Sequence, residues 1–348
     1  MCDFKLISLN VKGLGNSKKR LGIFRWLKKN KSDIIFVQES HGVKRIEKEW
    51  SREWGGEIVF CHGSSNSRGC MILVQKGFEC EVMSSKIDYG GRFIITRVEI
   101  KGEMFVLINV YLPNSEKDQL TFYSDLYKVM MSENISKSDN IIIGGDWNLV
   151  RNVNLDKLGG SDSTKKLSLQ KQEEIMTRLN LFDIWRIKNP LLKRYTWRQK
   201  NPLIQCRLDY FMISDQLYSE VKEIDILPSI HSDHSAIVLN FEKNKTSKKG
   251  PGFWKLNNSL LQDKSFIDQL TATLIGLKDY YKNTEDKRFV LEIIKYEIRK
   301  FCITFSKYKS NLRRCRENDL EKQLINLERK TLDDILLQEV ENIKSELI

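Results

Sequence analysis

The stretch Asn140–Leu149 has the sequence NIIIGGDWNL, and the rest of the chain is interpreted around it. Its three consecutive isoleucines are typical of a strand that is buried on both faces of a sheet. Gly144 and Gly145 are expected to end this strand, because glycine allows the backbone to turn sharply. Asp146 and Asn148 follow two residues apart, a spacing that points both side chains the same way in an extended segment. A carboxylate and an amide at a rigid strand end can hold a hard cation and a water.

Length and charge limit the class of protein. The 348 residues are 41% hydrophobic, enough for one large domain or two smaller ones. The formal net charge of +12 favours a polyanionic partner without identifying it. Residues 243–348 contain 22 basic and 16 acidic residues, so half of the net charge lies in this C-terminal part. The seven cysteines form no CxxC pair, which argues against a disulfide scaffold and against a thiolate zinc site.

The sequence contains no clear targeting signal. The N-terminal residues MCDFKLISLNVKGL lack the basic and then apolar layout of a secretory signal. No apolar run reaches the ~18 residues that a membrane span needs. We therefore expect an intracellular protein in a reducing compartment, with no membrane partner. The nucleus is one candidate location, although Lys243–Lys249 is only a weak import signal.

Hydrophobic patterning predicts an α/β fold of two packed sheets with helices outside. Strands are expected over 4–11, 33–38, 57–62, 69–74, 93–100, 104–111, 195–197, 206–213 and 237–241, and helices over 18–30, 115–131 and 166–179. We divide the chain into a domain over 1–242, a linker over 243–252 and a basic helical segment over 253–348. From Leu320 onward the apolar residues approximate a heptad stripe, with a phase slip near Asp333–Asp334. This pattern fits a short coiled coil and a solvated helical pair equally well.

Polar residues lie at the ends of apolar segments six times along the chain. They are Asn10, Glu39, Tyr111, Asp146 with Asn148, Asp209, and Asp233 with His234. Each one taken alone has an ordinary structural explanation, such as a surface carboxylate, and an isolated GDxN favours a surface turn. The ends of strands in one sheet converge in space, however, so the six together indicate one site.

The chemistry that suits this set is hydrolysis of a phosphodiester by a metal-assisted water. Glu39 and Asn10 offer the oxygen ligands that Mg²⁺ prefers, with Mn²⁺ as an alternative. The cation would neutralise charge that grows on the phosphoryl oxygens. Asp146 would accept the proton of the attacking water, and Asn148 would fix the position of that water.

Three further residues complete the predicted site on the phosphate side. His234 would donate a hydrogen bond to the scissile phosphate, and Asp209 would hold its tautomer. Tyr111 would add a hydroxyl donor to the same phosphate. General acid–base catalysis of this kind contributes ~10²–10⁴-fold to a rate. No serine or cysteine nucleophile is implied.

Six ordered motifs resemble the signature set of the exonuclease–endonuclease–phosphatase superfamily. They are SLN at 8–10, QES at 38–40, NVYLPN at 109–114, GGDWN at 144–148, RLDYF at 207–211 and SDHSAI at 232–237. The resemblance covers residues 3–242. It implies a four-layered α/β sandwich, a Mg²⁺-dependent nuclease mechanism and the roles assigned above. It also implies a metal or phosphate role for Asp233 and a phosphate-side role for Asn114.

Within this superfamily, the sequence resembles the endonuclease domain of LINE-type (non-LTR) retrotransposon second open reading frames. The features are QESH, YTW at 195–197, the hairpin into RLDY, and GPGFWKLNNSLL at 250–261, which is similar to the connector after the nuclease. The resemblance implies that the hairpin tip, Arg198–Gln205, probes a DNA groove. It places these residues near DNA: Thr196, Arg198, Lys200, Arg207 and Ser232.

Two departures from the retrotransposon pattern stand out. Trp147 occupies a position where the family more often has phenylalanine, and we expect it to pack equally well. The chain also ends at Ile348 without a YxDD-type polymerase motif. We therefore expect a copy or fragment truncated before the reverse transcriptase.

The leading functional hypothesis is a Mg²⁺-dependent endonuclease that nicks one strand of duplex DNA, as in retrotransposon target-site nicking. One alternative is an abasic-site repair endonuclease of the same superfamily. A phosphoinositide or sphingolipid phosphodiesterase fits the charge but not the connector. The last alternative is a non-catalytic remnant that binds DNA or RNA through its basic C-terminal helices. Lys307–Arg316 (KYKSNLRRCR) is typical of a phosphate-binding surface or, equally, of a solvated helix face.

Overall fold

The computed structural model describes residues 3–161, 164–228, 231–242, 255–328 and 334–347. The chain divides into two compact units, one formed by residues 1–244 with 324–348 and the other by residues 245–323. The linker predicted over 243–252 falls outside the described residues. Among the helices that are described, none combines the length and the apolarity needed to cross a membrane. All the cysteines in the described ranges are free.

The first unit contains two six-stranded sheets of mixed direction. One has the order β14-β15-β1-β2-β4-β3, and the other has the order β10-β13-β8-β7-β6-β5. The strands of the first sheet are β1 (Phe4–Asn10), β2 (Ile34–Gln38), β3 (Glu57–Cys61), β4 (Cys70–Val74), β14 (Val221–Leu227) and β15 (Ala236–Phe241). Those of the second are β5 (Cys80–Ile87), β6 (Phe93–Ile100), β7 (Glu103–Tyr111), β8 (Ile141–Asp146), β10 (Leu181–Asp183) and β13 (Asp209–Ser214).

Strand direction is equivalent in the two sheets, and this positions the site. β1 runs parallel to β2, and β15 is antiparallel to β1. β7 likewise runs parallel to β8, and β13 is antiparallel to β8. The C-terminal ends of four strands and the N-terminal ends of two others therefore meet at one end of the sandwich. A small third sheet has the order β11-β12-β9, formed by β9 (Lys157–Leu158), β11 (Trp197–Gln199) and β12 (Ile204–Cys206).

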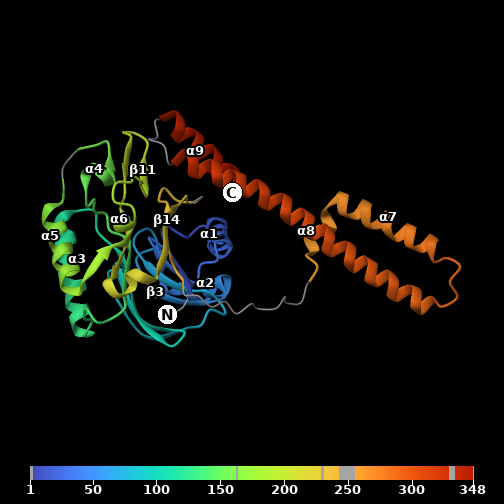
Figure 1. Cartoon of the computed structure of the whole chain (residues 1–348), viewed down its shortest axis with the longest axis horizontal. Helices are drawn as coiled ribbons and strands as arrows, with labels where there is room; N and C mark the ends of the chain where they lie inside the picture. Colours follow the sequence, from blue (N-terminus) through green and yellow to red (C-terminus); the bar gives the residue numbers. More distant parts are fainter. Residues whose placement is uncertain (1–2, 162–163, 229–230, 243–254, 329–333, 348) are drawn as a thin grey trace. The chain divides into compact units, whose positions relative to one another are not determined.

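Helices cover the outer face of each sheet, which makes four layers. The first sheet packs on α1 (Ser17–Lys29) and α2 (Glu47–Trp54) through side chains such as Phe24 and Trp50. The second packs on α3 (Glu116–Ser132) and α5 (Lys166–Leu179). Figure 1 shows these two pairs of helices on opposite sides of the sheets. A separate apolar core fills the space between the sheets. The predicted four-layered α/β sandwich is confirmed. The first unit also contains the short helices α4 (Val153–Asp156) and α6 (Ile184–Lys188), the 3₁₀ turns Lys44–Ile46 and Asp215–Glu220, and α9 (Asp334–Glu346).

The two glycines of the opening stretch do not end the strand as expected, because β8 continues through them to Asp146. They are required for close packing instead. A Cβ on Gly144 would lie 2.3 Å from the ring of Phe211, and one on Gly145 would lie 1.9 Å from the carbonyl oxygen of Val110. Gly145 also has a φ of +147°, which L side chains rarely adopt. The glycines thus let the neighbouring strands approach β8.

The C-terminal part is helical, as predicted. In the second unit, α7 (Lys264–Tyr280) packs on α8 (Lys287–Glu328) through Phe266, Cys302 and Phe305. An ion pair of 2.8 Å between Lys309 and Asp263 also joins the two helices. The 3₁₀ turn Asn258–Gln262 precedes α7, and α9 (Asp334–Glu346) begins at the predicted phase slip.

Candidate active site

Strand pairing brings the predicted residues to one edge of the second sheet. Asp146 is the last residue of β8, where it pairs with Tyr111 at the end of β7 and with Asp209 at the start of β13. In the first sheet, Asn10 ends β1, and Glu39 directly follows β2. Backbone ladders therefore fix Asn10, Tyr111, Asp146 and Asp209, and Glu39 is the residue after one of these strands.

Asn10 joins the two sheets at this edge. Its Nδ2 donates to Oε1 of Glu39 at 2.8 Å and to Oδ2 of Asp146 at 2.9 Å. On the neighbouring strand, Nε2 of Gln38 donates to Oδ1 of Asn109 at 2.7 Å, again from one sheet to the other. Because these groups are buried, the hydrogen bonds hold the two sheets in a fixed relation beneath the site.

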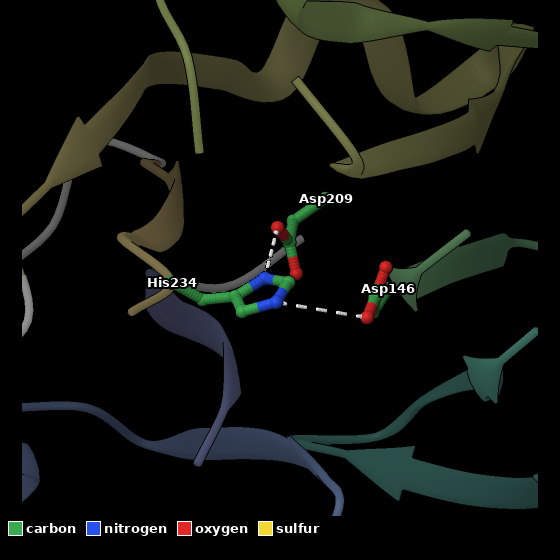
Figure 2. Close-up of side chains that lie close together, drawn as sticks. All are labelled: Asp146, Asp209 and His234. Atoms are coloured by element: carbon green, nitrogen blue, oxygen red, sulfur yellow. Dashed lines mark hydrogen bonds and ion pairs between the residues drawn. The ribbon is translucent and has the colours of Figure 1, made fainter. Parts of the chain in front are cut away.

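A histidine lies between two carboxylates in the same place. Nδ1 of His234 is 2.8 Å from Oδ2 of Asp209, and Nε2 of His234 is 3.9 Å from Oδ2 of Asp146. Figure 2 shows the imidazole ring between the two aspartates. Nδ1 therefore carries the hydrogen of the Asp209 bond, and Nε2 faces Asp146. All three side chains are buried, so these charges interact with little screening.

Burial and mutual charge displace the pKa values of this group. Burial, followed by the charge of Asp209, raises the pKa of Asp146 to about 7. Burial alone would lower the pKa of His234, but the charges of Asp209 and Asp146 outweigh it and raise the pKa to about 9. At neutral pH the imidazole is therefore a cation that can donate, while Asp146 titrates close to the working pH of a general base.

Asn148 and Tyr111 complete the predicted catalytic set. Asn148 has a φ of 44°, and its backbone N–H donates to Oδ1 of Asp146 at 3.0 Å. Its side-chain Nδ2 donates to the carbonyl of Leu112 at 2.8 Å, which fixes the orientation of the amide. Tyr111 is hydrogen-bonded to Glu39, and burial, with the charge of Glu39, raises its pKa, so the phenol stays protonated. The guanidinium of Arg92 lies 4.7 Å from the centre of its ring.

A cavity of about 480 Å³ opens over these residues. Of the predicted site residues, its lining includes Glu39, Asn114, Asp146, Asn148, Asp233 and His234. Asn10, Tyr111 and Asp209 reach this set through the hydrogen bonds described above. The sequence analysis missed a further group of lining residues, which are Lys12, Lys157, Thr164, Lys165, Trp197 and Leu208. Trp197 and Leu208 lie within the motifs YTW at 195–197 and RLDYF at 207–211, and Lys12 lies two residues after Asn10, whereas Lys157, Thr164 and Lys165 lie in no motif.

Two residues expected to contact DNA are buried in structural roles. The guanidinium of Arg207, 1% exposed, is ion-paired at 2.7 Å with both Asp156 and Asp183, so it is closed off from a phosphate. Thr196 is fully buried, and its hydroxyl oxygen accepts the backbone N–H groups of Leu208 and Asp209 at 2.9 and 3.0 Å. Both side chains are occupied by the fold, which does not favour the expected DNA contacts of Arg207 and Thr196, and these contacts stay predictions.

The remaining expected DNA contacts lie nearer to solvent. Oγ of Ser232 donates to the carbonyl of Asn10 at 2.6 Å. Arg198 is half-buried and donates to Oγ of Ser235 at 3.0 Å. Lys200 is at the hairpin between β11 and β12, and its ammonium group donates to Gln338 in α9 at 2.8 Å. The strands of this hairpin pair from Trp197 with Cys206 to Gln199 with Ile204, closer to the tip than expected, so the tip is residues 200–203 rather than Arg198–Gln205.

The residues at this edge fit a hard divalent cation. Ligand oxygens of Asp146 and Asp209 lie within 4.8 Å of each other, and the cationic imidazole of His234 between them is not counted as a ligand. Oδ1 of Asp209 and Oδ1 of Asp233 are buried without a hydrogen-bond partner among the described residues. Oδ2 of Asp233 is already paired with Lys12 at 2.8 Å. Together with the carboxylate of Glu39, the donors are mainly oxygens, the kind that Mg²⁺ and Mn²⁺ bind.

Comparisons with known proteins agree with this arrangement. The chain is 27% identical over 328 residues to the transposon TX1 uncharacterized 149 kDa protein of Xenopus laevis, covering 93% of this chain and 24% of that protein. The chain thus spans about a quarter of the length of this relative.

Solved structures share the fold of the first unit. An AP endonuclease from Leishmania major matches with a TM-score of 0.58 and 20% identity, over 70% of this chain and 88% of that one. A 3′ phosphatase from Neisseria, bound to a product DNA hairpin, matches with a TM-score of 0.56 and 18% identity, over 69% of this chain and 100% of that one. Residues 7–234 match the endonuclease/exonuclease/phosphatase family, and the chain therefore belongs to that family.

Proposed function

We propose that the protein is a Mg²⁺-dependent endonuclease that nicks one strand of duplex DNA, with Mn²⁺ as an alternative ion. The observation that carries the proposal is the placement of His234 between Asp209 and Asp146 in the wall of a cavity that also presents Glu39. A cationic imidazole, a carboxylate titrating near pH 7 and spare ligand oxygens are what hydrolysis of a phosphodiester requires.

Each residue has a defined task in this proposal. Asp146 accepts the proton of the attacking water, and Asn148 orients that water beside it. His234, held by Asp209, donates from Nε2 to a phosphate oxygen and stabilises the charge that develops there. Glu39, Asn10 and Asp233 are the proposed holders of the cation, which when bound would stabilise the charge that develops on the pentacoordinate phosphoryl group. Tyr111 and Asn114 are placed on the phosphate side.

Similarity to the transposon protein supports target-site nicking as the biological context. That similarity covers 93% of the chain and so includes residues of the C-terminal helices, whereas the matched structures cover about 70%. In this context the basic helices are proposed to bind DNA or RNA, and the nucleus is the proposed location. The DNA-bound neighbour supports DNA as the substrate of the shared fold.

The test is a nicking assay on supercoiled plasmid, with Mg²⁺ and with EDTA. We expect conversion to the open-circular form with Mg²⁺ only, and loss of conversion in Asp146→Asn. The matched control is Asp125→Asn, the same substitution at an exposed position on α3. The proposal is refuted if the intact protein leaves the plasmid supercoiled with Mg²⁺, or if Asp146→Asn nicks at the wild-type rate.

The same assay separates the alternative of an abasic-site repair endonuclease, which the fold of the Leishmania AP endonuclease brings into consideration. Two duplexes of one sequence are compared, one intact and one with a single abasic site. We expect cleavage of both at similar rates. Cleavage that depends on the lesion would replace target-site nicking by repair, and absence of cleavage with retained DNA binding would favour a non-catalytic remnant.

A further inference from the structure

One wall of the active cavity carries positive charge that the proposed chemistry does not use. Besides the carboxylates, Lys157, Thr164 and Lys165 line the cavity, and these three come from the segment between α4 and α5. β9 ties the start of this segment to the hairpin strand β12, because Lys157 pairs with Cys206. The segment is therefore attached to the fold at the edge of the active site.

Lys165 is held in place by the start of α5. It is the residue immediately before that helix, whose first turn is fixed by Glu116 of α3. Oε1 of Glu116 accepts the backbone N–H groups of Leu167 at 2.8 Å and Ser168 at 3.3 Å. Ser168 is fully buried, so the helix start cannot move away from the second sheet without exposing it. The Lys165 backbone is thus pre-positioned at the cavity.

The ammonium group of Lys165 has spare donors. It is half-buried and donates to the backbone carbonyl of Asn148 at 2.5 Å. No carboxylate among the described residues forms an ion pair with it, although Asp146 is close enough to favour its charged form. An ammonium group has three donors, so two remain. In contrast, Lys12 on the same cavity is already paired with Asp233.

The hydrogen bond to Asn148 does not by itself explain why the ammonium group of Lys165 is half-buried. Nε2 of Gln119 also donates to the Asn148 carbonyl, at 3.0 Å, so this acceptor is satisfied without Lys165. Partial burial disfavours the charged form of Lys165 more than the nearby charges of Asp146 and Glu116 favour it, and a negatively charged ligand in the cavity would compensate that cost. The group that enters this cavity in the proposed reaction is a DNA strand.

We propose that Lys165 binds a phosphate of the DNA strand that occupies the active cavity. This inference rests on the proposed function and adds a substrate-binding residue to it. The ammonium group acts as a point charge with rotatable donors, and its contact with a phosphate releases a counterion from the DNA. A phosphate contact of this kind makes affinity depend on salt.

The experiment compares Lys165→Ala and Lys165→Arg with wild-type protein on a duplex oligonucleotide. Binding is measured in EDTA between 50 and 200 mM salt, where no cleavage occurs, and KM and kcat are measured with Mg²⁺. For Lys165→Ala we expect Kd and KM to rise about tenfold at the lower salt. The slope of log K against log salt should become shallower by about 0.9, the value for one phosphate contact. Lys165→Arg should restore most of the slope.

The matched control is Lys171→Ala on the same helix. Lys171 lies outside the active cavity and is paired with Glu174 at 2.8 Å, so its removal should leave slope and KM unchanged. Thermal melting of each variant shows whether it is folded, and Lys165→Gln, which keeps a hydrogen-bond donor, replaces alanine if Lys165→Ala melts early.

Two outcomes overturn the inference while leaving the proposed function intact. The first is an unchanged salt slope and Kd in a folded Lys165→Ala protein that still nicks DNA. The second is a fall in kcat alone, because this result would assign Lys165 to positioning Asn148. A wild-type protein that neither binds nor nicks duplex DNA overturns the proposed function, and the inference with it.

Discussion

Two clusters of buried charge begin two residues apart, at Arg207 and Asp209, and they are built differently. The first is closed, since Arg207 is paired with Asp156 and Asp183, and Asp156 is paired in turn with Arg186 at 2.5 Å. The second is open. Asp209 gives one oxygen to His234, and its other oxygen has no partner among the described residues.

The pKa values show the consequence of this difference. Burial would raise the pKa of Asp156, but Arg207 and Arg186 outweigh it and lower the pKa. For Asp146 in the open cluster, burial and a like charge raise the pKa to about 7. A closed cluster satisfies its own charges, whereas an open one needs a cation or a substrate to do so. Buried charged groups with unused hydrogen-bonding or ligand atoms, rather than buried charges as such, thus indicate a functional site.

The largest expected effect comes from removing the charge of Asp209 from the open cluster. In Asp209→Asn the charge that raises the pKa of His234 is lost, while burial continues to lower it. The imidazole then loses its proton at a lower pH than about 9, and the nicking rate should fall ~10²–10⁴-fold. Nicking rates between pH 6 and 10 measure this effect, and the alkaline limit of activity should move to lower pH.

A matched variant keeps this result interpretable. Asp215 directly follows the other end of the same strand and is exposed. The substitution Asp215→Asn should therefore leave the pH dependence of the nicking rate unchanged. An alkaline limit that stays in place in Asp209→Asn would show that the pair with Asp209 does not set the protonation of His234.

A substitution in the closed cluster should lower the stability of the protein and leave the nicking rate of the folded protein unchanged. Arg207→Met leaves Asp156 and Asp183 buried without their principal cation, which we expect to lower the free energy of unfolding by about 3–5 kcal/mol. Urea unfolding measures this loss. The nicking rate per folded molecule and the salt dependence of DNA binding should not change. If the variant had normal stability but bound DNA more weakly, Arg207 would contact DNA as the sequence predicted.

Much of the fold could be predicted because its central strands are continuous runs of β-branched residues. The helix Lys166–Leu179 and the strand Phe93–Ile100 have the predicted bounds. The missed elements lack such patterns. Strand β5 is exposed along most of its length, and α2 buries only Trp50 and Trp54 in an otherwise polar segment. Tertiary contacts, rather than local pattern, decide these elements.

The site was predictable only in part for a related reason. Polar residues at strand ends can be recognised in a sequence, and strand pairing then brings them together. Sequence spacing cannot reveal that the guanidinium of Arg207 is ion-paired within the fold, since its partners Asp156 and Asp183 are 51 and 24 residues away. Lys165 lies in an irregular segment whose position depends on Glu116 in another helix. Neither feature leaves a periodic pattern.

The smallest expected effect comes from Thr196, which tests the comparison of the two clusters directly because it supports the backbone between them. Its hydroxyl oxygen accepts the N–H groups of Leu208 and Asp209, the residues that follow Arg207. Thr196→Val keeps the shape but leaves both buried N–H groups unpaired, so we expect a loss of about 1–3 kcal/mol in unfolding free energy. Because Asp209 then loses an anchor, kcat for nicking should also fall.

Thr196→Ser is the control for this last effect, since it keeps the accepting oxygen and removes only a methyl group. It should recover most of the stability and of kcat. If Thr196→Val lost stability while kcat per folded molecule stayed normal, the open cluster would hold its geometry without the backbone anchor. The hydrogen bond from His234 to Asp209 would then be sufficient to position the carboxylate. A loss of both properties would instead show that the structural and the catalytic cluster share one support.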